Sequence, residues 1–206
     1  MKTALGSRDF AAQYQQQPVP QDGGLLKWSW FRPYAVAPLR GYEDQIIQSW
    51  DTASKAAELN DYSACTTWLI REGAYYLLDV HRERLEYPDL KRRVIELAER
   101  WRPHAVLIED KGSGIHLLQE LRSASGLSAI PMLPQGDKIV RASTHSAMIE
   151  GGRVRVPEQA PWLGEFQAEI SAFPNGRHDD QVDSLSQFLA WAYDDEYNAP
   201  RIRFLD

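Results

Sequence analysis

The spacing of apolar residues predicts that the chain begins its regular structure with strands. Runs of apolar, β-branched and aromatic residues predict three strands, at residues 45–50, 63–70 and 74–80. The short turn at residues 71–73 indicates that the second and third strands form a hairpin. A chain that opens in this way builds the first part of its sheet from antiparallel neighbours.

After the hairpin, helical and strand-like patterns alternate. Apolar residues spaced three and four apart predict a helix over residues 87–101, and four consecutive apolar residues at 105–108 predict a buried strand. The remaining predicted elements are a helix at 115–124, a strand at 129–133, a helix at 138–150, a strand at 153–157, and helices at 162–173 and 179–195. This order predicts an α/β fold, a mixed sheet of three hairpin-connected strands and then βα units, with helices on both faces. It is similar to the order of a ribonuclease-H-like domain.

The first 40 residues have a different character. The stretch at residues 10–24 is rich in Gln, Pro and Gly and has no helical or strand period, which predicts an extended arm or linker. The aromatic residues that follow would pack on the body of the domain, an interpretation that we favour over packing on a neighbouring protein; they are Trp28, Trp30, Phe31 and Tyr34. We therefore divide the chain into an arm at 1–40, a domain at 41–196 and a tail at 197–206.

Composition excludes several classes of protein. Seven Trp, nine Tyr and six Phe are too many for a disordered chain, and the single cysteine, Cys65, excludes a disulfide framework or a Cys-based zinc site. No apolar run is long enough to span a membrane, and no signal peptide is visible, so we expect a reducing, cytosolic setting. The net charge of −6 argues against binding nucleic acid through bulk charge, but it does not decide what one cleft does.

Acidic residues stand where predicted strands end and where the last helix begins. Asp51 follows the first strand, Glu109 follows the strand at 105–108, and Asp179, Asp180 and Asp183 open the last helix. If the two strands are neighbours, their ends lie about 5 Å apart. Converging carboxylates repel one another unless cations lie between them, and Mg²⁺ prefers such oxygen ligands. The pattern predicts a site for two divalent ions, Mg²⁺ or Mn²⁺, of the kind that cleaves phosphodiesters.

Each acidic position also has a simpler explanation. Asp51 alone is as well explained as a turn residue or a helix cap. Glu109 follows the buried strand directly, where an unused acid is costly. We prefer it to Asp110, which would point to the opposite face of the strand.

The acidic cluster at the start of the last helix divides by position. Asp179 is a natural N-cap, and capping alone can account for it. Asp180 and Asp183 are spaced i, i+3, so both can reach one ion. We favour Asp180 as a direct ligand and Asp183 as a second ligand or a holder of water.

Basic and glycine residues near these acids are candidates for contacts with DNA phosphates. The loop Lys111–Gly114 could approach a phosphate at the helix that follows, or could be an ordinary tight turn. Lys138 and Arg141, spaced i, i+3, could hold DNA or form a solvated face, and His178 could contact a phosphate or be exposed. Further possible backbone contacts are Arg153, Arg155 and Arg177.

Several segments, taken in order and spacing, resemble the C-terminal nuclease domain of the large terminase subunit of tailed bacteriophages. The resemblance covers nearly the whole chain, and its segments are residues 6–16, Gln48–Ala53, Leu107–Gly114, Gly136–Ala142 and His178–Ser184. It implies a ribonuclease-H-like fold and Mg²⁺- or Mn²⁺-dependent cleavage of concatemeric viral DNA during genome packaging.

The resemblance also implies site residues, partners and a location. By matching motif, Asp51, Glu109 and Asp180 or Asp183 would bind metal, and Lys138 and Arg141 would lie near DNA. The partners implied are double-stranded DNA, the terminase ATPase domain, the small terminase subunit and the portal, in the cytoplasm of the infected host and transiently on the viral prohead. The chain has no Walker motif, so we expect an excised domain or a free-standing nuclease half that follows an absent ATPase domain.

Two other functions compete with the nuclease. In the first, the chain is a non-catalytic docking module of the packaging motor that binds the ATPase domain, the portal or DNA. In the second, it is an actin-like phosphotransferase, which would need a second, duplicated half that the sequence lacks. Retention of all the carboxylate groups favours the nuclease over the docking module.

Overall fold

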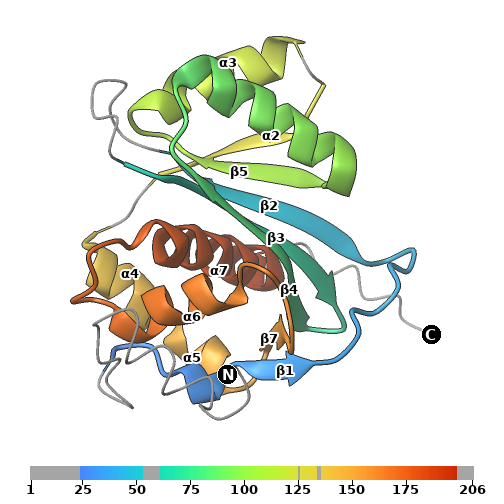
Figure 1. Cartoon of the computed structure of the whole chain (residues 1–206). Coiled ribbons are helices and arrows are strands. Elements are labelled where there is room, and N and C mark those ends of the chain that lie inside the picture. The colour runs from blue at the N-terminus through green and yellow to red at the C-terminus, as the bar shows by residue number, and fades with distance from the viewer. Residues whose placement is uncertain (1–23, 53–60, 125, 134–135, 199–206) are drawn as a thin grey trace, which may run out of the picture.

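A seven-stranded mixed sheet forms the centre of the molecule (Figure 1). The computed structural model describes residues 24–52, 61–124, 126–133 and 136–198. The strands are β1 (Arg32–Tyr34), β2 (Gln45–Asp51), β3 (Ser63–Arg71), β4 (Ala74–Glu83), β5 (Ala105–Glu109), β6 (Ala129–Met132) and β7 (Val154–Pro157). Their order across the sheet is β1-β7-β4-β3-β2-β5-β6.

Helices cover both faces of this sheet. The short 3₁₀ helix η1 (Trp28–Trp30) precedes α2 (Tyr87–Trp101), α3 (Ser113–Ala124), α4 (Lys138–Thr144), α5 (Ser146–Glu150), α6 (Leu163–Ala172) and α7 (Asp180–Asn198). Helices α2 and α3 lie over one face, and α4 to α7 lie over the other (Figure 1). The predicted α/β fold with a mixed sheet and helices on both faces is confirmed. No helix in the described part of the chain is long and apolar enough to cross a membrane.

The hairpin and the parallel strands join at β2. Strand β2 pairs antiparallel with β3, which pairs antiparallel with β4. The β3–β4 turn consists of Glu72 and Gly73, both with positive φ, the geometry that suits the twist of a two-residue hairpin. On its other edge β2 pairs parallel with β5, and β5 with β6. The carboxyl ends of β2 and β5 therefore lie side by side.

Each face of the sheet has its own apolar core. Under α7, the ring of Phe188 stacks on Trp68 with centroids 4.5 Å apart, and both side chains are fully buried. On the opposite face, Trp50 and Ile108 are buried against α2 and α3. Because side chains alternate along a strand, these cores fix which residues of β2 and β5 face α7.

A helix and an edge strand differ most from the prediction. The predicted helix at 138–150 is wrong as a single helix, because it breaks at His145 into α4 and α5. Thr144 Oγ1 donates back to the carbonyl of Val140, and Ser146 Oγ donates to that of Ser143; such bonds compete with the helical ladder. Strand β1, which we did not predict, pairs parallel with β7.

Part of the segment that we assigned to an arm joins the fold. Leu26 and Phe31 are buried in the core under α6 and α7, and Trp28 stacks on Phe31 with centroids 5.1 Å apart. The favoured packing of these aromatic residues on the body of the domain is thus what the structure has. The first two residues of the predicted tail, 197 and 198, belong to α7. Residues 1–23 of the arm and 199–206 of the tail lie outside the described residues.

Candidate active site

Two candidate acids end neighbouring strands on the same face of the sheet. Trp50 of β2 pairs with Ile108 of β5, and both side chains pack toward α2 and α3. Asp51 and Glu109 are the next residues of their strands, so they point to the opposite face, toward α7.

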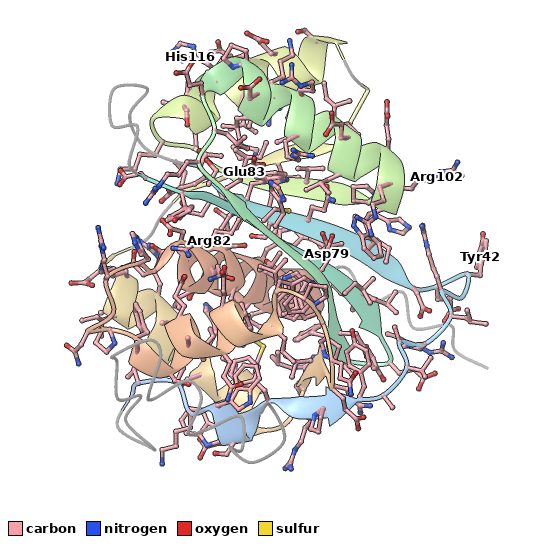
Figure 2. The ribbon with its side chains drawn as sticks, viewed as in Figure 1. Tyr42, Asp79, Arg82, Glu83, Arg102 and His116 are labelled. Carbon is pink, nitrogen blue, oxygen red and sulfur yellow. The ribbon has the colours of Figure 1, made fainter. Side chains whose placement is uncertain are left out.

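The same cross-strand row continues into the hairpin. Asp51 lies opposite Ala64 of β3, and Ala64 lies opposite Arg82 of β4. The row therefore runs from Glu109 through Asp51 and Ala64 to Arg82. The small side chain of Ala64 lies between the two acids and the Arg82 guanidinium. Figure 2 shows Arg82 on the side of the sheet that α7 covers.

Helix α7 is held against this row by buried hydroxyl groups. Ser49 Oγ and Ser184 Oγ lie 2.8 Å from the backbone carbonyls of Ser184 and Ser49, respectively. Ser184 Oγ also accepts the backbone N–H of Thr66 of β3. Since Ser184 is the neighbour of Asp183, these bonds place the first turns of α7 over the ends of β2 and β3.

The pKa of Asp51 reflects the acids that surround it. Burial raises the pKa of the Asp51 carboxyl well above its usual range, and the negative charges of Asp183, Glu109, Asp180 and Asp179 raise it further. The structure thus brings all the predicted acids close enough for their charges to act on Asp51. A concentration of carboxylates of this kind is typical of a site that binds cations.

Each acid at the start of α7 is paired with a basic side chain from another element. Burial also raises the pKa of Asp183, and its hydrogen bond to Arg141 acts in the opposite direction. The hydrogen bond to Asp179 raises the pKa of the Lys138 ammonium. The pairs are Arg82 with Asp180 at 3.1 Å, Arg141 with Asp183 at 2.8 Å, and Lys138 with Asp179.

The acids of these ion pairs are also the candidate ligands of a metal ion. Among the described residues, no three His, Cys, Asp or Glu side chains form a ready-made group that could hold an ion. The charged groups that raise the pKa of Asp51 are all carboxylates, the ligands that Mg²⁺ and Mn²⁺ prefer, and divalent charge would relieve their mutual repulsion. The donor set fits a hard divalent cation, which would share the carboxylates of α7 with Arg82 and Arg141.

The glycine loop after β5 packs on the protein itself. A Cβ atom at Gly114 would lie 2.0 Å from the backbone oxygen of Glu109, so only glycine permits the close approach of α3 to the end of β5. The N–H of Lys111 also donates to the Glu109 carbonyl, at 2.9 Å. The geometry is that of a tight turn which fixes Glu109, and the Lys111 side chain is exposed beside it.

The other basic candidates fall into two groups. His178 lies next to the acids, half-buried, with its ring edge-on to Tyr62 at 5.2 Å. Arg153 and Arg155 instead bind the Tyr75 and Tyr76 hydroxyls on β4, six or seven residues before Arg82 and about 20 Å along the strand. The structure does not bring those two arginines to the candidate site.

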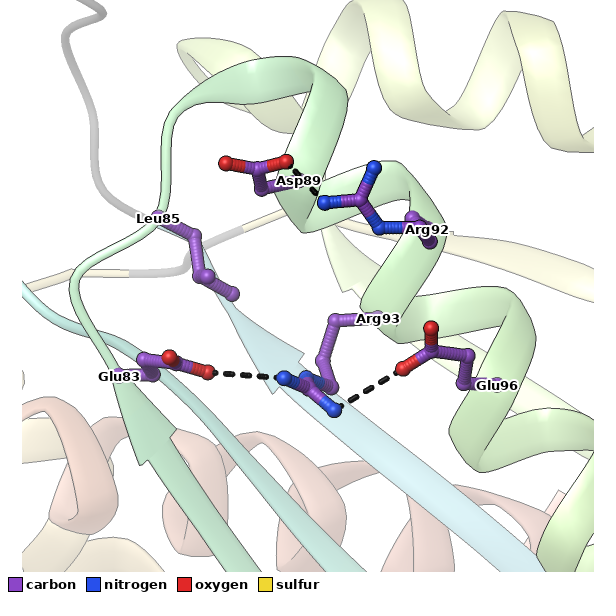
Figure 3. A pocket seen from close by; sticks show the side chains of 6 residues that line it. All are labelled: Glu83, Leu85, Asp89, Arg92, Arg93 and Glu96. Atoms are coloured by element: carbon purple, nitrogen blue, oxygen red, sulfur yellow. Dashed lines mark hydrogen bonds and ion pairs between the residues drawn. The ribbon is translucent and has the colours of Figure 1, made fainter.

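The small cavity in Figure 3 lies on the other face of the sheet, between the end of β4 and α2. It has a volume of about 120 Å³ and is lined mainly by charged side chains. Arg93 pairs with Glu83 and Glu96, and Arg92 pairs with Asp89. Its charges are satisfied within its own lining, so it is not the candidate site.

Sequence reasoning missed three residues of the site. Arg82 was missed because the predicted third strand ended at residue 80, whereas β4 continues to Glu83. Glu169 lies in none of the quoted segments, and Ser184 ends the segment His178–Ser184 but was given no role there. Each acts through a buried contact between elements distant in sequence. Only the i, i+1 proximity of Ser184 to Asp183 could have drawn attention to it.

The fold agrees with the comparisons. The sequence model described as "Terminase RNaseH-like domain" matches residues 48–191. The chain belongs to this family. The match spans all four acids on which the predicted metal site depends.

Solved structures of terminases share the fold. The large terminase nuclease from thermophilic phage G20c, with bound magnesium, is 18% identical, with a TM-score of 0.62, over 83% of this chain and 98% of that one. The Thermus phage P74-26 large terminase nuclease domain is 19% identical, with a TM-score of 0.55, over 76% and 87%. No curated protein sequence matches the chain.

One of the similar structures is a longer terminase. The large terminase of another thermophilic bacteriophage, solved with ADP, is 13% identical, with a TM-score of 0.59. The match covers 77% of this chain and 41% of that terminase. Membership of the terminase family also sets aside the actin-like alternative.

Proposed function

We propose that this terminase domain is a metal-dependent DNA endonuclease that cleaves concatemeric viral DNA during genome packaging. The observation that carries the proposal is the row of Glu109 and Asp51 at adjacent strand ends, faced by the carboxylates of α7. Support comes also from the G20c nuclease, which has been solved with cobalt, magnesium and zinc.

The side chains of the site would hold the metal ions, and none of them would act as a covalent nucleophile. Asp51 and Glu109 from the sheet and Asp180 and Asp183 from α7 would hold two divalent ions, Mg²⁺ or Mn²⁺. Bound divalent ions activate water and stabilise the charge that develops in phosphodiester hydrolysis. The tight turn at Gly114 would keep Glu109 in place while this happens.

The motor context belongs to the same proposal. The longer phage terminase solved with ADP supports an ATPase domain as the partner of this one. Double-stranded DNA would be the substrate, and the small terminase subunit and the portal would be further partners, in the cytoplasm of the infected host and transiently on the prohead.

Cleavage of supercoiled plasmid by the purified domain tests the proposal. We expect nicked and linear DNA with Mg²⁺ or Mn²⁺ and none after chelation, because the carboxylates alone cannot activate water. Glu109→Gln should lower the rate at least about 100-fold, since even partners of metal ligands contribute 10–100-fold. Metal-independent cutting, or equal cutting by Glu109→Gln, would contradict the site.

A docking module without nuclease activity remains the second candidate. Calorimetry with Mn²⁺ separates the two: a folded domain that binds no Mn²⁺ near millimolar concentration would be a docking module. If the parent binds Mn²⁺ and Asp51→Asn binds it more weakly, the result supports the nuclease site.

The basic residues near the acids should contribute to DNA binding. We propose that Lys138, Arg141, Lys111 and His178 contact phosphates, and the two on α4 allow the sharpest test. The double variant Lys138→Gln/Arg141→Gln should reduce the slope of log K against log salt by about one per lost cation. Fluorescence anisotropy with duplex DNA in Ca²⁺ measures this slope. Arg92→Gln, on the exposed side of α2, is the control, and an unchanged slope in the double variant would remove Lys138 and Arg141 from the interface.

A further inference from the structure

A buried carboxylate from α6 caps the start of α7. Glu169 is 8% exposed, and its Oε1 accepts the backbone N–H of Gln181 at 2.6 Å and that of Val182 at 3.3 Å. Its Oε2 accepts the side-chain amide of Gln181 at 2.6 Å. The first N–H groups of a helix have no partner within the helix, so Glu169 supplies what a local cap would otherwise supply.

A single guanidinium links this carboxylate to a candidate metal ligand. Arg82 Nη2 lies 3.6 Å from Glu169 Oε2 and 3.1 Å from Asp180 Oδ2. The Arg82 guanidinium also lies 3.8 Å from the centre of the Tyr62 ring, which limits its movement. Arg82 lies in the same cross-strand row as Asp51 and Glu109. Its ion pair with Asp180 therefore fixes Asp180 relative to the sheet.

The contacts of Glu169 and Arg82 hold three consecutive residues at the start of α7. Asp180 is bound through its side chain, and Gln181 and Val182 through their backbone N–H groups. A rotation or shift of the first turn of α7 would break bonds to a buried carboxylate, which is costly. Metal sites depend on such outer contacts to orient the carboxylates that bind the ion.

We propose that Glu169 is a positioning residue of the nuclease site, acting through Arg82 and the first turn of α7 to hold Asp180 opposite Asp51 and Glu109. The inference rests on the proposed function, because it concerns the same site. It assigns a role to a side chain that need not touch metal or DNA.

Mn²⁺ binding to Glu169→Gln tests the inference without relying on activity. Glutamine has the same shape, but its NH2 group is a donor. In one orientation it would face the Gln181 amide and Arg82, and in the other the backbone N–H groups of Gln181 and Val182, which all donate as well. By calorimetry we expect the affinity for Mn²⁺ to fall about 10-fold or more in folded protein. In plasmid cleavage, kcat should fall while KM for DNA stays unchanged. Glu165→Gln, exposed on the same helix, should match the parent in both measurements.

A second variant keeps the inference testable if Glu169→Gln does not fold. Arg82→Lys retains the charge but cannot pair with two carboxylates and lie flat on Tyr62. It should also weaken Mn²⁺ binding. Parent-like affinity for Mn²⁺ in whichever of the two variants folds would show that the Glu169–Arg82 link is structural only, and would overturn the inference. A folded parent that binds no Mn²⁺ would instead overturn the proposed function.

Discussion

Asp51→Asn should abolish DNA cleavage and, in the same protein, raise the stability of the metal-free domain. The Asp51 side chain is half-buried beside four other acids, and its desolvation and their negative charges raise its pKa well above the usual range. A raised pKa means that the folded state disfavours the charged form, so at neutral pH the charge destabilises the fold. The amide has the same shape and no charge, so it relieves the repulsion while removing a metal ligand.

The expected changes are large and opposite in sign. Cleavage should fall at least about 100-fold, because a loss of this size already follows from removing the partner of a ligand. The free energy of unfolding in chelator should rise by about 0.5–2 kcal/mol, as is common when a strained functional group is neutralised. Plasmid cleavage and urea unfolding measure the two effects. Glu99→Gln, an exposed position of α2, should change neither.

Two results would contradict this account of Asp51. Cleavage at the parent rate would show that Asp51 is not a metal ligand. Lower stability in chelator would show that hydrogen bonds to the carboxylate outweigh the repulsion from Asp183 and Glu109.

Gly114→Ala should damage the site without altering any acid. The new Cβ would lie 2.0 Å from the backbone oxygen of Glu109 and 3.2 Å from Ile108 Cγ2, so the backbone must move. Overpacking of this kind costs about 1–3 kcal/mol of stability. Because the contact is to the carbonyl of Glu109 itself, the displacement falls on a candidate ligand, and a shift of about 1 Å can cost 100-fold in rate.

The control for this variant is another helical glycine. A Cβ at Gly164 of α6 meets nothing within 4 Å, so Gly164→Ala should leave cleavage unchanged and stabilise the helix by about 0.5–1 kcal/mol. Unfolding by urea and plasmid cleavage compare the two. Parent-like cleavage by Gly114→Ala would mean that the β5–α3 turn can adjust without moving Glu109.

The parts of the fold that the sequence could predict depend on local pattern. Apolar spacing located α2, and the apolar run at 105–108 located β5 together with the acid at its end. The hairpin turn at Glu72 and Gly73 was equally visible, because its positive φ angles favour glycine. In each case the residues that determine the element lie within it.

The parts that could not be predicted depend on distant partners. Strand β1 has three residues and exists because β7, more than a hundred residues later, pairs with it. Arg82 extends β4 beyond its apolar stretch because Ala64 of β3 still offers it a partner. Glu169 joins the site through the backbone of α7, which no spacing along the sequence reveals.

The position of β1 determines how mechanical force would travel through the domain. The described chain enters through a hydrogen bond from Leu25 to Phe173 and then through β1, the outermost strand on the side of β7. Tension on the chain before residue 25 would first load these contacts, with β1 sheared along β7. Strands β7, β4 and β3 lie between that edge and β2. The acids at the ends of β2 and β5 are therefore three strands away from this edge, whereas the bond to Phe173 loads the carboxyl end of α6, the helix that carries Glu169.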